Sequence, residues 1–200
     1  MAMSSDDVTA RMRDQWAKVS ARLEAYELIL PGTPSFICQP HVCDAHCCRR
    51  FSVSLGESEA ARMHTSSGLQ FIDFLEVEDG QPVTLPLAQP YLLARRDNHC
   101  ALLGDNLGCT QYEGRPRACQ QYPHHVLFFD GEAVRPVHGD LPAMAAGLSA
   151  ALAGECETLT PLLLRHVECP GFTGPPILEG EWRALLQATA VLQYPQLLRQ

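Results

Sequence analysis

Apolar side chains recur at helical spacing near the start of the chain. Between residues 6 and 30 they stand three or four positions apart, at Met12, Trp16, Val19, Leu23 and Tyr26. This is the period of an amphipathic helix with one buried face. The Pro-Gly-Thr-Pro stretch at 31–34 is typical of a helix end. The pattern predicts an N-terminal helix within residues 1–30.

The middle of the chain shows short apolar runs separated by turn residues, which is a β pattern. Four short strands are predicted between residues 82 and 136, at YLLARR, CALL, VLFF and EAVRPV. An Asp-Gly pair at 130–131 predicts a hairpin between the last two. Upstream, FSVSL predicts another strand. There Ser54 and Glu57 resemble a capping box that opens a helix through about residue 65.

Three further helices are predicted toward the end of the chain, at about 142–152, 159–166 and 179–198. The sequence contains no internal repeat, low-complexity tract or interdomain linker. Helices at both ends around short central strands indicate an α+β fold. We expect a small β-hairpin core with flanking N- and C-terminal helices.

Nine cysteines add a second pattern, because seven of them fall into two clusters. The first cluster, CQPHVCDAHCC, spans 38–48 and has no apolar stripe, so a loop is predicted there. The second cluster, CALLGDNLGCTQYEGRPRAC, spans 100–119. Its Asp-Asn pair at 105–106 favours a turn that would place Cys100 and Cys109 on the two arms of a hairpin.

Composition and charge narrow the class of protein. A hydrophobic content of 46% suffices for one sizeable core, and the net charge of -8 argues against nucleic acid as the main partner. No apolar run reaches the roughly 18 to 20 residues that span a bilayer, and the first residues lack the pattern of a secretory signal. We therefore expect a cytoplasmic protein without a membrane partner. In that compartment, dense cysteine indicates metal binding or catalysis rather than disulfides.

Metal binding is the leading interpretation of the two clusters. Four thiolates complete a tetrahedral zinc site or hold a 4Fe–4S cluster. The adjacent Cys47 and Cys48 pose a difficulty, since neighbouring side chains of an extended segment point to opposite sides. Either a tight turn brings both to one metal, or the pair serves two centres. His41, His46 and His99 stand beside the cysteines and are alternative zinc ligands.

Three stretches of the chain resemble the YkgJ-type cysteine-cluster family, which is described as a zinc- or iron-chelating domain: CQPHVCDAHCC, NHCALLGDNLGCTQYEGRPRACQQYP and ECPGF. The likeness extends from Cys38 to about Gly174. It implies that Cys156 is no ligand and that eight cysteines bind metal: Cys38, Cys43, Cys47, Cys48, Cys100, Cys109, Cys119 and Cys169. It also implies a set of residues that packs around the ligands: Tyr112, Glu113, Arg115 and Pro116.

Basic residues also stand close to the cysteines in the sequence. Four arginines flank the clusters: Arg49, Arg50, Arg115 and Arg117. They could offset the negative charge of metal-bound thiolates, which is costly in a low-dielectric site. As arginines of polar segments, they also fit an ordinary solvated surface.

The family resemblance implies a metal-binding protein. We expect an iron–sulphur cluster of the 4Fe–4S type, with a redox role or, as in a related flagellin lysine methylase, a role in protein modification. The alternative is zinc that staples a structural or interaction module without catalytic activity. The sequence leaves an enzymatic activity and a protein or small-molecule partner open. It contains no GxxxxGKS/T, GxGxxG, HExxH or GxSxG motif.

For the domain organisation, the sequence predicts one cysteine-cluster domain over residues 1–200. The N-terminal helix precedes a cysteine-rich α+β core at 35–138 with metal-binding loops. A helical part at 141–200 is expected to return Cys169 to this core.

Overall fold

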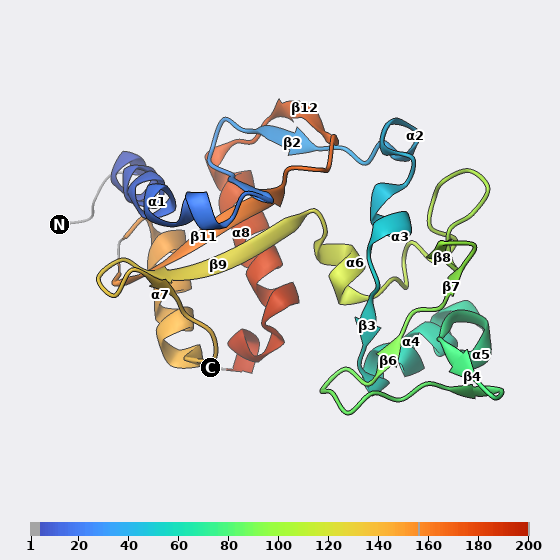
Figure 1. Ribbon diagram of the computed structural model, residues 1–200. Helices are drawn as coiled ribbons and strands as arrows, with labels where there is room; N and C mark the ends of the chain where they lie inside the picture. Colours follow the sequence, from blue (N-terminus) through green and yellow to red (C-terminus); the bar gives the residue numbers. More distant parts are fainter. Residues whose placement is uncertain (1–4, 156, 200) are drawn as a thin grey trace. The chain divides into compact units, whose positions relative to one another are not determined.

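A computed structural model of the chain describes residues 5–155 and 157–199 (Figure 1). The chain forms two compact units. Unit 1 combines the two ends of the chain, up to Ile37 and from Pro123 onward, and unit 2 runs from Cys38 to Tyr122. The α+β class predicted from the sequence is confirmed. The organisation as a single domain stays a prediction.

Unit 1 is built on a four-stranded antiparallel sheet with the strand order β1-β11-β9-β10. The strands are β1 Tyr26–Leu28, β9 His124–Asp130, β10 Arg135–Pro136 and β11 Leu159–His166. The central pair, β9 and β11, is in register from Leu159 opposite Asp130 to Arg165 opposite His124. Figure 1 shows these two strands running side by side.

The helix predicted at 159–166 is therefore wrong, because this segment is β11. Its first six residues are all buried, Thr160 among them, so this mainly apolar run shows no alternation of buried and exposed positions. An uninterrupted apolar run fits a fully buried strand and a buried helix equally well. Pairing with β9, which is distant in the sequence, decides between the two.

Helices pack against this sheet, and a smaller two-stranded sheet lies in the same unit. The helices of unit 1 are α1 Ser5–Val19, α7 Leu141–Ala153 and α8 Glu179–Gln193, with the 3-10 helices η1 Ser20–Arg22 and η2 Pro195–Arg199. The second sheet pairs β2 Pro34–Phe36 with β12 Phe172–Pro176. Helix α7 confirms the prediction at 142–152, and α8 confirms the helix predicted from 179 but ends at Gln193, before η2. The hairpin between β9 and β10 is present, but Asp130 pairs with Arg135, so residues 131–134 form the turn in place of the predicted Asp-Gly pair.

The N-terminal helix is shorter than predicted. It ends at Val19, and Tyr26 lies in β1, where it pairs with His166 of β11. An ion pair between Glu27 and Arg165 supports the same two strands. The helical spacing holds as far as Val19, but beyond it strand pairing provides the backbone hydrogen bonds.

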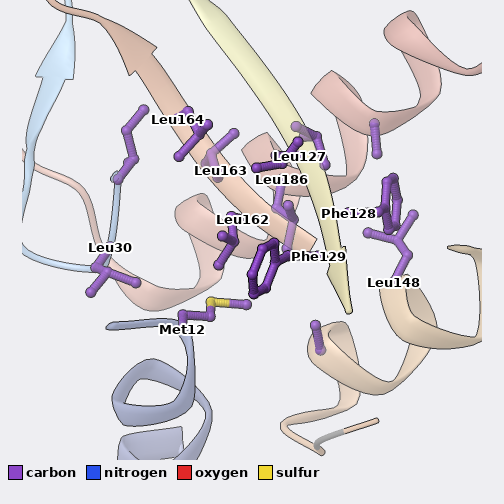
Figure 2. Close-up of a cluster of buried hydrophobic side chains, with 14 of the residues drawn as sticks. Met12, Leu30, Leu127, Phe128, Phe129, Leu148, Leu162, Leu163, Leu164 and Leu186 are labelled. Carbon is purple, nitrogen blue, oxygen red and sulfur yellow. The ribbon is translucent and has the colours of Figure 1, made fainter. Parts of the chain in front are cut away.

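The large core of unit 1 lies between the central strands and the helices. Figure 2 shows Met12 of α1 beside Leu162 and Phe129, and Phe128 beside Leu148 of α7. The indole N–H of the buried Trp182 on α8 donates to the Ile29 carbonyl at 2.9 Å. Burial of this extensive apolar surface, at about 25 cal/mol per Å², is the main source of stability for the unit.

A side-chain amide covers part of one strand edge in unit 1. The Val126 N–H donates to Gln193 Oε1 at 2.9 Å, and Gln193 Nε2 donates to the Val126 carbonyl at 3.0 Å. The last residue of α8 thus satisfies both backbone groups of Val126. Exposed strand edges invite pairing with other chains, and this amide protects one such position.

Unit 2 consists of short elements around a small core. Its helices are α2 Pro40–Cys43, α3 His46–Arg50, α4 Glu57–Ser67, α5 Phe71–Phe74 and α6 Arg117–Gln121. Its strands form three pairs: β3 Ser54–Leu55 with β6 Tyr91–Leu92, β4 Val77–Glu78 with β5 Gln81–Pro82, and β7 Arg95–Arg96 with β8 His99–Cys100. Seven apolar residues form the buried core: Leu55, Ala60, Met63, Phe74, Leu75, Leu93 and Leu102.

Two local predictions in unit 2 need correction. The first cysteine cluster is not a loop but contains α2 and α3. Helix α4 occupies the predicted position, yet its N-cap is Gly56 without a side-chain cap, so Ser54 caps nothing there. Ser54 instead lies in β3, and its hydroxyl donates a hydrogen bond to Gln89 Oε1 at 2.7 Å.

Among the described residues, no helix is long and apolar enough to cross a membrane.

The contact between α7 and β11 gives a direct test of packing in unit 1. A Cβ added at Gly147 of α7 would lie 2.3 Å from the Leu159 carbonyl oxygen, and this backbone atom cannot rotate away. Gly147→Ala should therefore lower the free energy of unfolding by about 1 to 3 kcal/mol, as overpacking does. Urea denaturation measures the change.

Gly180 of α8 is the matched control, since a Cβ there has no neighbour within 4 Å. Gly180→Ala should be neutral or stabilise by up to about 1 kcal/mol, because alanine favours helix. Equal effects of the two substitutions would contradict the packing of α7 on β11.

Candidate metal centre

A short helix resolves the difficulty of the adjacent cysteines. Cys47 and Cys48 lie in α3, where successive side chains are separated by about 100° rather than pointing to opposite sides. A hydrogen bond joins the two thiol groups. The geometric objection to the pair is therefore removed, while the choice between one metal for both sulphur atoms and two separate centres stays a prediction.

The chain reverses before α3 through two left-handed residues. Asp44 has φ 49° and Ala45 has φ 50°. The left-handed region is unfavourable for a residue with a β-carbon. Ala45 is only 3% exposed, and its burial helps to hold the turn between α2 and α3.

The second cysteine cluster is closed by a β-bridge. Cys109 lies opposite Leu103, and the Gly104 N–H donates to the Gly108 carbonyl at 2.8 Å. The Asn106 side chain accepts the Gly108 N–H at 3.0 Å, which is an Asx turn. The predicted turn is present, but its register sets Cys109 against Leu103 and not against Cys100.

Cys119 is carried by α6, whose first residue is Arg117. The Arg117 N–H donates to Oε1 of Glu59, on α4, at 2.8 Å. This bond links two helices that are 58 positions apart in the sequence. Nothing in the cysteine spacing predicts it.

Five thiols from three segments act on one another electrostatically. The charges of Cys47, Cys100 and Cys109 act on Cys119, and the same three act on Cys48. Cys100, Cys109 and Cys119 also pack against the small core of unit 2. We call these five the thiol group: Cys47, Cys48, Cys100, Cys109 and Cys119.

Within the thiol group, the pKa shifts favour one negative charge over several. The hydrogen bond from Cys48 lowers the pKa of Cys47 to about 6, and the same bond raises the pKa of Cys48. Burial raises the pKa of Cys119 to about 12 and also raises the pKa of Cys100 and Cys109. Further thiolates would form at the cost of burial and repulsion. A bound cation reverses that balance.

The other predicted ligands occupy different surroundings. Cys43 is half-buried and donates to the Pro40 carbonyl at 3.8 Å, and Cys38 is exposed. Cys169 belongs to unit 1, where it packs against the large core. None of the eight described cysteines forms a disulfide. Cys156 lies outside the described residues.

The three histidines named as alternative ligands differ in environment. His41 is exposed, and the His46 ring packs edge-on against Phe51 at 5.8 Å. The His99 ring nitrogen Nδ1 lies 2.9 Å from the Cys100 carbonyl oxygen. His99 therefore contacts the backbone of a thiol-group residue through this nitrogen.

The donor chemistry fits a soft metal, whereas the arrangement does not yet form a closed site. Thiolates suit zinc and iron–sulphur clusters. Within residues 5–155 and 157–199, however, no group of three or more His, Cys, Asp or Glu side chains is arranged to hold a metal ion. The thiols of the thiol group thus lie within electrostatic reach of one another, but their side chains are not arranged as the ligands of one metal ion.

The residues expected to pack around the ligands are mostly at the surface of unit 2. Tyr112 and Glu113 are exposed, and Pro116 is buried at the N-cap of α6. The Arg115 guanidinium lies 3.7 Å from the Tyr112 ring centre and donates to the Tyr112 carbonyl. Burial raises the pKa of Cys109, and the positive charge of Arg115 partly opposes this.

Arg95 is an organising residue that sequence analysis missed. Its guanidinium donates to the Phe51 carbonyl at 2.9 Å and to the Arg49 and Asn98 carbonyls at 2.5 Å. Two of these carbonyls end α3, so Arg95 ties the helix of Cys47 to the β7–β8 hairpin of Cys100. By contrast, Arg50 and Arg117 are exposed.

The fold and this site together define a cysteine-rich α+β protein in which thiols distant in the sequence converge. A family model named CxxCxxCC, with the description "Putative zinc- or iron-chelating domain", matches residues 37–142, more than half of the chain. The chain belongs to this family. The matched range contains every predicted ligand except Cys169. Comparison with curated proteins gave no significant match, and neither did comparison with solved structures.

Removal of the Arg95 side chain should loosen α3. Arg95→Ala leaves three carbonyls without their charged donor, and each such bond is worth about 1.5 to 3 kcal/mol. We expect faster hydrogen exchange in the peptide that covers α3. We also expect the free energy of unfolding to fall by about 1.5 to 3 kcal/mol, the value of one such bond. Exchange followed by mass spectrometry and urea denaturation measure the two effects.

Arg96→Ala is the control, because the neighbouring Arg96 makes one exposed hydrogen bond, to the Asp73 carbonyl at 3.1 Å. Its effect on stability should stay within about 0.5 kcal/mol. Unchanged exchange in α3 of the Arg95 variant would show that this residue does not organise the site.

Proposed function

We propose that unit 2 binds iron as a 4Fe–4S cluster through its thiol group. One observation carries the proposal: negative charge on Cys47, Cys100 and Cys109 raises the pKa of both Cys48 and Cys119, so thiols from α3, from residues 100–109 and from α6 lie within electrostatic reach in one small unit. Membership in a zinc- or iron-chelating family supports metal binding. The choice of a cluster over a single ion is our inference.

The preference for iron–sulphur over zinc rests on the histidines named as alternative zinc ligands, of which His46 acts on Cys47 only through its charge. Zinc sites commonly mix thiolates with histidine. His41 is exposed, and His99 contacts a backbone carbonyl. A set made of thiols alone matches the four-thiolate ligation of cubane clusters and also that of all-cysteine zinc sites, so the metal analysis below separates the two.

We further propose that the thiols close around the metal as it binds. The described thiols are near one another without forming a metal-ligand geometry. Metal binding often completes local folding, since the binding free energy is also folding free energy. The short helix α3 and the hairpin with Cys100 can adjust by small rotations, and Arg95 keeps them in register.

A cluster held here would supply one-electron redox chemistry. Arg95 and Arg115 contribute positive charge that acts on Cys100 and Cys109, which reduces the cost of collecting thiolates. A redox role is therefore the first candidate activity. A role in protein modification requires a coordination position open to a substrate.

Zinc as a structural staple is the second candidate. It is favoured by the limited core of unit 2, in which seven buried apolar residues hold together strands of two residues each. Small units with so little apolar burial commonly need a metal or disulfides. In this case the metal would present a surface and do no chemistry.

Metal analysis distinguishes the two candidates. Protein purified without oxygen should contain iron and acid-labile sulphide in equal amounts and show a brown absorption that air bleaches, because exposed clusters are oxidised readily. Reconstitution with iron and sulphide should restore the colour. Zinc without labile sulphide, in a protein that stays colourless after reconstitution, would contradict the cluster proposal and favour structural zinc.

Cysteine replacements test the ligand set. Cys109→Ser should lose metal and stability together, because serine is a poor ligand and bound metal contributes to folding. Cys156→Ser is the control and should keep the full metal content. Metal per chain and thermal denaturation are the measurements.

The same measurements on Cys38→Ser, Cys43→Ser and Cys169→Ser test the eight-ligand set implied by the family resemblance. Loss of metal in each supports eight ligands, whereas full retention restricts binding to the thiol group. If Cys109→Ser keeps its metal, the thiol group is not the site.

A further inference from the structure

Glu59 is a charged side chain buried beneath the thiol group's α6 segment. It lies on α4 and is only 6% exposed. A buried carboxylate is costly unless hydrogen bonds or charges compensate it. Its Oε1 atom accepts the Arg117 N–H at 2.8 Å and lies 3.8 Å from the guanidinium of Arg62.

The Arg117 N–H is one that α6 cannot satisfy by itself. The first N–H groups of a helix have no partner within the helix. The N-cap of α6 is Pro116, and no side-chain cap hydrogen bond comes from it. Glu59 provides the acceptor from a different helix. Cys119 follows two positions after the capped residue.

A second contact holds the same segment against α4. A Cβ on Gly114 would lie 2.7 Å from the hydroxyl oxygen of Ser66, so the backbone of Gly114 approaches α4 closely. The Gln120 side chain donates to the Arg115 carbonyl at 2.8 Å and fastens α6 to the chain before it. The segment that presents Cys119 is thus held against α4 on its N-terminal side and braced by a bond of its own.

We propose that Glu59 is a positioning residue for the metal centre. Its carboxylate holds the start of α6 so that Cys119 meets the other thiols, and it acts through the hydrogen bond to Arg117. The inference rests on the proposed function, in which the thiol group binds metal. An amide oxygen accepts the same hydrogen bond, so Glu59→Gln should preserve the position, whereas Glu59→Ala should lose it.

Alkylation of the metal-free full-length chain tests the position without any metal. Mass spectrometry gives the rate at which iodoacetamide modifies Cys119, with Cys43 in α2 as the internal reference. Glu59→Ala should raise the Cys119 rate about tenfold, the value of one hydrogen bond to a charged group. Glu59→Gln should leave it within about twofold of wild type.

Cobalt binding tests the consequence for the centre. Co²⁺ bound by thiolates has a charge-transfer absorption that can be titrated. Loss of a residue that orients a ligand typically costs about 10- to 100-fold in metal affinity, and we expect this for Glu59→Ala. The absorption per bound Co²⁺ should also fall as Cys119 leaves the ligand set. Glu59→Gln should restore both.

Arg117→Pro removes the donor and keeps the acceptor. Proline is tolerated at the first position of a helix, so α6 can still form. Its Co²⁺ affinity should fall as in Glu59→Ala. The double variant should be no weaker than either single one, because both remove the same bond. If Glu59→Ala does not fold, the Co²⁺ affinity and Cys119 alkylation rate of Arg117→Pro test the role of this hydrogen bond.

Unchanged Cys119 alkylation and Co²⁺ affinity in Glu59→Ala and in Arg117→Pro would overturn the proposal. So would a Gln variant as impaired as the Ala variant, since charge and not the hydrogen bond would then matter. A wild-type chain that takes up neither Co²⁺ nor iron contradicts the proposed function instead. The alkylation rates still decide the role of Glu59 in that case.

Discussion

The collection of several thiols in one partly buried group is the constraint on which unit 2 depends. Each additional thiolate costs desolvation and repulsion from its neighbours, and the raised pKa of Cys100, Cys109 and Cys119 expresses this cost. The hydrogen bond between Cys47 and Cys48 stabilises a single negative charge. A metal cation turns the same proximity from a cost into the source of binding.

Backbone hydrogen bonds from charged side chains hold this group together in place of a large core. Arg95 joins the end of α3 to the β7–β8 hairpin, and Glu59 joins α4 to the start of α6. Each bond spans a long stretch of sequence and ends at an element that carries a cysteine. Unit 1 differs, because its long β9–β11 pair and surrounding helices bury an extensive apolar surface.

The two units therefore differ in what stabilises them, and in unit 2 stability is linked to function. In unit 1 the buried apolar surface accounts for the fold, so a substitution such as Gly147→Ala acts through packing. In unit 2 a few charged hydrogen bonds and the proposed metal would share that task. A cysteine or arginine substitution there is then expected to alter metal content and local order together.

The sequence alone determined the features that depend on local spacing. The hairpin after β9, the helices α7 and α8, the α+β class and the cysteine motif of the chelating family could all be read from it. Tertiary structure decided the rest. The strand at 159–166, the end of α1 and the roles of Arg95 and Glu59 depend on partners far away in the chain. Periodicity contains no information about such partners, because an apolar run or an isolated charge looks the same until another segment satisfies it.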